Sequence, residues 1–116
     1  MWLFLNDSFL SIVADRDGSN NLLVRARRSG DIKKVFPTAK PWEDSTADYR
    51  FRALLPRDVV AGKIAERVAA IAYPNFKDSV PETDRHNAYF QVWDIMYRWG
   101  RVPAGFAETL GADREE

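Results

Sequence analysis

Residues 22–28 read LLVRARR and residues 49–55 read YRFRALL, and these two stretches decide the fold. Apolar and basic side chains alternate in both, with a period of two that is typical of strands with one buried face. We therefore expect two neighbouring strands in one antiparallel sheet, with a helix packed on their apolar face. That inner face is predicted to carry Val24, Ala26, Tyr49, Phe51, Ala53 and Leu55.

The sequence before residue 22 predicts two more strands. Residues 2–5 and 9–14 are short runs rich in apolar, aromatic and β-branched side chains, and they flank the turn residues 6–8. This pattern is typical of a hairpin. A second turn cluster follows at residues 17–21, so the simplest interpretation is a three-stranded meander.

Helical patterns follow the meander. Residues 29–36 predict an N-cap and one or two helical turns, ended by Pro37, and residues 38–47 predict a polar loop. Residues 57–72 predict a longer helix, because one apolar stripe runs along it. That stripe consists of Val60, Ile64, Val68 and Ile71.

A third helix is predicted from residue 79 to about Trp99, since Ser79 and Glu82 have the spacing of a capping box. The order β-β-β-α-β-α-α then predicts an α+β fold, with an antiparallel sheet of about four strands and helices packed on one face. We expect residues 1–103 to form a single domain and residues 104–116 a short tail with at most one helical turn.

Composition excludes several classes of protein. The chain has 116 residues and no cysteine, which rules out disulfides, thiolate zinc sites and a cysteine nucleophile. No apolar run approaches the roughly 18 residues of a membrane span. The N-terminus lacks the basic region of a signal peptide. We therefore expect a cytoplasmic protein with no membrane partner.

Four arginines are predicted to share the outer face of the sheet: Arg25, Arg27, Arg50 and Arg52. Neighbouring residues on one face lie about 5 Å apart, where like charges repel. A phosphate, a nucleic acid or an acidic protein surface could balance these charges, because guanidinium binds oxyanions bidentately. Alternatively, carboxylates of the same chain pair with the arginines and the face is simply solvated. The candidates are Asp15, Asp17, Asp48 and the acidic C-terminal residues.

The third predicted helix carries many aromatic side chains. One stripe contains His86, Phe90, Trp93 and Tyr97, and a second contains Tyr89, Val92, Met96 and Trp99. One interpretation is that part of so wide an apolar arc faces a partner, and a second copy of the chain could be that partner. The alternative is that the helix is buried against both the sheet and another helix. In either case we expect Phe90 and Trp93 to be mostly buried, within the chain or at a homodimer contact.

His86 is the only histidine, and no cysteine or second histidine completes a common metal site with Glu82 and Asp84. No motif places Ser79 or Thr83 as its nucleophile, and the glycines follow no phosphate-loop spacing. We therefore expect no cofactor, no metal and no enzymatic activity. A small hydrolytic enzyme that uses His86 stays an alternative.

Three blocks of the sequence form a recognisable set: MWLFLNDSFLSIVAD at the start, ADYRFRALLPR in the middle, and YPNFKDSV before RHNAYFQVWDIM. They resemble blocks shared by a group of short bacterial and phage-type proteins that has no assigned function. The resemblance covers roughly residues 1–97. It implies a recurring structural plan around residues 48–52 and 73–77, and it implies no activity or ligand.

These observations predict a non-catalytic interaction module of the inhibitor, immunity or regulatory-subunit type. It would bind a protein partner through the aromatic helix, the arginine face or both. A nucleic-acid-binding protein that uses the four arginines is an alternative. The zero net charge favours a protein partner. So does the predicted lack of aromatic rings among the arginines, because Tyr49 and Phe51 are expected on the opposite face.

Overall fold

The computed structural model describes residues 1–103, which belong to two compact units, one comprising Met1–Ser79 and the other beginning at Val80. The predicted tail at residues 104–116 lies outside the described residues. The single domain expected over residues 1–103 stays a prediction.

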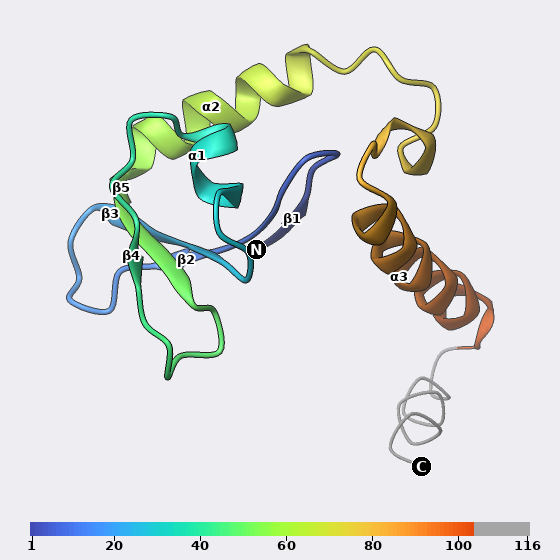
Figure 1. Ribbon diagram of the computed structural model, residues 1–116, viewed down its shortest axis with the longest axis horizontal. Coiled ribbons are helices and arrows are strands. Elements are labelled where there is room, and N and C mark those ends of the chain that lie inside the picture. Colours follow the sequence, from blue (N-terminus) through green and yellow to red (C-terminus); the bar gives the residue numbers. More distant parts are fainter. Residues whose placement is uncertain (104–116) are drawn as a thin grey trace. The chain divides into compact units, whose positions relative to one another are not determined.

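The first unit contains a five-stranded antiparallel sheet in the order β1-β2-β3-β5-β4 (Figure 1). This confirms the α+β class, with one strand more than the expected four. The extra strand, β4, lies within the segment predicted as a polar loop, and two residues are too few to show a period of two. The strands are β1 (Trp2–Phe4), β2 (Phe9–Ala14), β3 (Asn21–Ala26), β4 (Trp42–Glu43) and β5 (Phe51–Pro56).

The turns follow from local chemistry. In the hairpin between β1 and β2, the Leu5 amide donates to the Ser8 carbonyl at 2.8 Å. Between β2 and β3, Gly18 adopts a φ of 76°, in the left-handed region that costs glycine least. Its amide donates to the Asp15 carbonyl at 3.1 Å. These two turns give the predicted meander.

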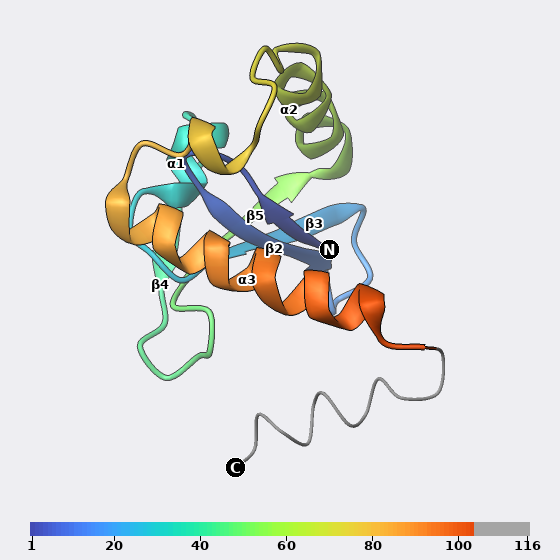
Figure 2. The same ribbon diagram turned by 90° about the vertical axis from the view of Figure 1, so that its right-hand side faces the viewer.

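The apolar core lies on one face of the sheet, where α1 (Asp31–Val35) and α2 (Arg57–Ala69) both pack (Figures 1 and 2). The predicted inner face is therefore confirmed for the two central strands. Buried residues of this core are Leu10, Ile12, Val24, Ala26, Ile32, Val35, Phe36, Ala39, Ala53 and Val60, with Phe51 and Leu55 packed against them.

The stripe predicted on α2 is only half correct. Val60 is buried and Ile64 packs against the core. Val68 and Ile71 are 62% and 51% exposed, and Ile71 lies beyond the end of the helix. The first half of α2 thus covers the sheet. The apolar stripe continues beyond this contact to residues that are exposed.

Asp31 connects α1 to the hairpin. Its side chain is buried, and Oδ2 accepts a hydrogen bond from the Phe9 amide at 3.0 Å. Because Phe9 begins β2, this bond fixes where the strand starts relative to the helix.

The second unit is built on α3 (Thr83–Arg101), one uninterrupted helix (Figure 2). The capping-box prediction is wrong, because Glu82 is the N-cap and the Ser79 hydroxyl donates to the Phe76 carbonyl instead. Ser79 ends the short 3-10 helix η1 (Lys77–Ser79). Within residues 1–103, no helix is both long and apolar enough to cross a membrane.

Candidate functional site

Two of the four predicted arginines meet at the centre of the sheet. Arg25 on β3 and Arg52 on β5 are direct cross-strand partners. Arg25 Nη2 donates to Ser11 Oγ at 2.6 Å, and Arg52 Nη1 donates to the Tyr49 carbonyl at 3.2 Å. Neither forms an ion pair with any residue in the described part of the chain. Two like charges therefore lie side by side with only neutral acceptors bonded to them.

The other two arginines have carboxylate partners. Arg27 donates to both carboxylate oxygens of Asp48, from Nη1 at 2.8 Å and from Nη2 at 3.3 Å. This bond from Arg27 holds the pKa of Asp48 below its usual value. Arg50, which precedes β5, lies 3.3 Å from a Glu43 carboxylate oxygen. Half of the cluster is therefore neutralised within the chain, and Asp48 is one of the partners that the sequence suggested.

Tyr49 corrects the sequence prediction. It was expected on the inner face, but its buried ring lies among the arginines. The guanidinium carbons of Arg25 and Arg27 are 4.6 and 4.3 Å from the ring centroid. The alternation of β5 does not reach Tyr49, because the strand begins only at Phe51. Phe51 itself packs against the core as predicted.

The strand register extends the arginine pair into a row that crosses the whole sheet. Its outer members are tryptophans that are 67% exposed on β1 and 45% exposed on β4. Sequence reasoning missed this row because it depends on the register and on the unpredicted strand β4. The only available signal was a tryptophan within an otherwise polar segment. The row consists of Trp2, Ser11, Arg25, Arg52 and Trp42.

On α3, the predicted stripe forms a ladder of rings. Phe90 stacks on Trp93 with centroids 5.8 Å apart, and Trp93 stacks on Tyr97 at 5.3 Å. Arg101 extends the ladder, with its guanidinium carbon 5.4 Å from the Tyr97 ring centroid. The stripe also includes His86, one turn before Phe90.

The expectation that Phe90 and Trp93 are mostly buried within the chain is wrong. Phe90, Trp93 and Tyr97 are 47%, 45% and 49% exposed. The physical reason is that the rings stack on one another along the helix, so each covers only part of its neighbour and about half of each residue stays exposed. Burial at a homodimer contact stays a prediction. Together we call Phe90, Trp93 and Tyr97 the aromatic ladder.

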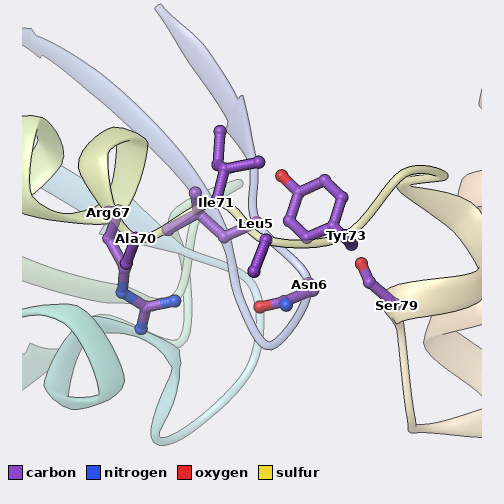
Figure 3. A pocket seen from close by; sticks show the side chains of 8 residues that line it. Leu5, Asn6, Arg67, Ala70, Ile71, Tyr73 and Ser79 are labelled. Carbon is purple, nitrogen blue, oxygen red and sulfur yellow. The ribbon is translucent and has the colours of Figure 1, made fainter.

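A separate hollow of about 330 Å³ lies in the first unit, between α2 and the β1–β2 hairpin (Figure 3). Arg67 lines it, but this guanidinium binds both carboxylate oxygens of Asp7, at 3.1 and 3.0 Å, and the Lys34 carbonyl at 3.0 Å. The hollow therefore presents mainly apolar side chains and a cation that is already paired. Its labelled lining residues are Leu5, Asn6, Arg67, Ala70, Ile71, Tyr73 and Ser79.

Comparison with known proteins gives no relative: no family model matches the chain, and neither do any curated protein or solved structure.

Proposed function

We propose that this chain is a non-catalytic interaction module that binds a protein partner through the aromatic ladder of α3. The observation that carries the proposal is the exposure of three stacked rings, each between 45% and 49%, on one helix. Contiguous exposed apolar patches are uncommon on soluble proteins and typically mark interaction surfaces. Tryptophan and tyrosine are also enriched among the residues that dominate interface energies.

Stacking also favours binding through preorganisation. A ring fixed against its neighbours loses less side-chain freedom when a partner covers it, so less of the binding energy is lost to ordering. Three half-exposed rings offer on the order of 300 Å² of apolar area, or about 7 kcal/mol before association costs. Those costs are about 4–15 kcal/mol, so we expect neighbouring contacts to contribute as well.

Met96 is suited to supply such contacts, being 53% exposed on the same helix. The arginine cluster supports a protein partner over a nucleic acid as the main ligand, since Asp48 and Glu43 neutralise two of its four charges. A second copy of the chain is one form that the partner could take.

Photo-crosslinking in the native host tests the proposal. A photoreactive residue would replace Phe90 or Tyr97 within the ladder, or Ala88 or Gln91 elsewhere on the helix as matched controls. We expect adducts to one defined protein from the ladder positions and few from the controls. Equal labelling at all four positions, or none at the ladder, would contradict it. An adduct between two copies would identify the partner as a second chain.

A further inference from the structure

We propose a second binding site, independent of α3, in which Arg25 and Arg52 bind the phosphate group of a nucleotide with Trp42 beside it. The site goes beyond the proposed protein interaction and uses only residues of the first unit. Its basis is the row in which β3, β5 and β4 place these three residues as successive cross-strand neighbours.

Charge provides the first argument. Like charges directly opposite in a sheet are destabilising, so an arginine pair at the sheet centre without an ion-paired carboxylate among the described residues favours the binding of an anion. Asp48 and Asp44 interact electrostatically with Arg25 and Arg52, respectively, but their hydrogen bonds go to other groups. Asp48 binds Arg27, and Asp44 accepts hydrogen bonds from the Thr46 amide and hydroxyl at 3.0 and 2.7 Å.

Hydrogen bonding provides the second argument. Nε of Arg25 is buried and has no acceptor among the residues that the structure describes. A buried donor without a partner is destabilising, and an accepting oxygen near Arg25 would remove this cost. The described chain leaves this group unsatisfied although Ser11 and Tyr49 already hold the same guanidinium in place.

The number of donors favours phosphate over a single carboxylate. Each guanidinium has five N–H donors, and one donor of each is already used, by Ser11 for Arg25 and by the Tyr49 carbonyl for Arg52. Two such groups match the charge of about −1.5 to −2 and the three terminal oxygens of a phosphate monoester. A carboxylate has one charge and two oxygens, and a single arginine satisfies it.

The neighbouring ring favours a nucleotide over inorganic phosphate. Trp42 is the cross-strand partner of Arg52 and is 45% exposed, so a base bound next to Arg52 could stack on its ring. Stacking on an aromatic side chain strengthens the binding of any base, because every base has a π-face. A free mononucleotide fits the two guanidinium groups best, because a phosphodiester within a strand has only one charge and two non-bridging oxygens. A single strand is the other source of a phosphate and a base, and the test distinguishes the two.

Titration of the full-length chain with adenosine monophosphate, followed by NMR of the arginine Nε–Hε groups, tests the site. We expect the signals of Arg25 and Arg52 to shift, and Arg52→Gln to weaken binding at least about 10-fold, the effect of losing one charge-assisted bond. The matched control is Arg57→Gln, which removes the same charge from an exposed arginine bonded to Asn20. This control should bind as the unmodified chain does.

A second variant keeps the test valid if Arg52→Gln unfolds. Trp42→Ala should weaken adenosine monophosphate about 5- to 100-fold and leave inorganic phosphate unaffected, because only the base is stacked. An oligothymidylate of about ten residues distinguishes the two sources. Tighter binding of the oligonucleotide, with an affinity that falls as about the 0.7 power of salt for each phosphate contacted, would identify a single strand.

Three results would overturn the site. The first is the absence of any shift at Arg25 and Arg52 up to about 10 mM ligand, a concentration that would detect even a very weak complex. The second is an equal loss in Arg57→Gln and Arg52→Gln. The third is stronger binding of a glutamate-rich peptide, which would make the pair a contact for an acidic protein. All three leave the ladder on α3 untested, so this site and the proposed function can fail separately.

Discussion

The guanidinium of Arg25 lies over the ring of Tyr49, with its carbon 4.6 Å from the ring centroid. Arg27 is equally close to the same ring, at 4.3 Å. A cation over an aromatic face is attracted by the quadrupole of the ring, so one buried tyrosine holds two arginines whose charges repel each other. This arrangement links the end of β3 to the residues that precede β5.

Tyr49→Leu should lower the free energy of unfolding by about 1–3 kcal/mol, through the loss of both cation–π contacts and of the packing of the ring. Tyr49→Phe keeps the ring and should lower it much less. Chemical denaturation of both variants measures the difference. Equal losses for leucine and phenylalanine would show that the arginines do not depend on the ring.

Asp31→Ala should destabilise the first unit by about 1–3 kcal/mol, because the Phe9 amide that bonds to its carboxylate would be left without this acceptor. The matched control is Asp17→Ala, which removes an exposed carboxylate. Denaturation followed by tryptophan fluorescence compares them. A loss no larger than that of the control would mean that the bond to β2 contributes little.

Stability in acid should depend on Asp7. Its partial burial acts to raise its pKa, but the hydrogen bonds and positive charge of Arg67 outweigh this and leave the pKa below its usual value. A carboxyl group with a lowered pKa in the folded state stabilises the fold above its unfolded pKa of about 3.9. This contribution disappears as the pH falls through the folded pKa.

Asp7→Asn should therefore cost about 1 kcal/mol at pH 7, a modest value because water screens a side chain that is about one-third exposed. The stability of the Asp7→Asn variant should also fall less than that of the unmodified chain below about pH 4. The two stability curves should converge in acid. Parallel curves down to about pH 2 would show that the Arg67 bond does not shift the titration of Asp7.

Much of the fold could be predicted from the sequence because alternation directly reports burial. Val24, Ala26, Phe51 and Ala53 face the core as the period of two required. The prediction failed where regular elements end. Tyr49 precedes β5, so the alternation of the strand does not apply to it, and its ring lies on the outer face with the arginines.

The candidate sites could be predicted only as lists of residues. The sequence suggested the ring stripe on α3 and the four arginines, but it could not show which arginines are neutralised. That depends on Asp48 and on Glu43 of the unexpected strand β4. Nor could the sequence place Trp42 beside Arg52, because cross-strand neighbours follow from the register, and the register needs both strands.

Trp93→Ala tests whether the aromatic ladder binds a protein partner, because the same variant separates a core ring from an interface ring. Trp99→Ala is the matched control, a tryptophan of similar exposure on the same helix but outside the ladder. The measurements are the free energy of unfolding and the yield of the crosslinked complex. We predict that the free energy of unfolding of Trp93→Ala lies within about 1 kcal/mol of that of the unmodified chain. The yield of the crosslinked complex should fall at least about 10-fold in Trp93→Ala and stay largely unchanged in Trp99→Ala. A destabilisation of about 3–5 kcal/mol, as for a core tryptophan, or a complex that survives Trp93→Ala unchanged, would contradict the account.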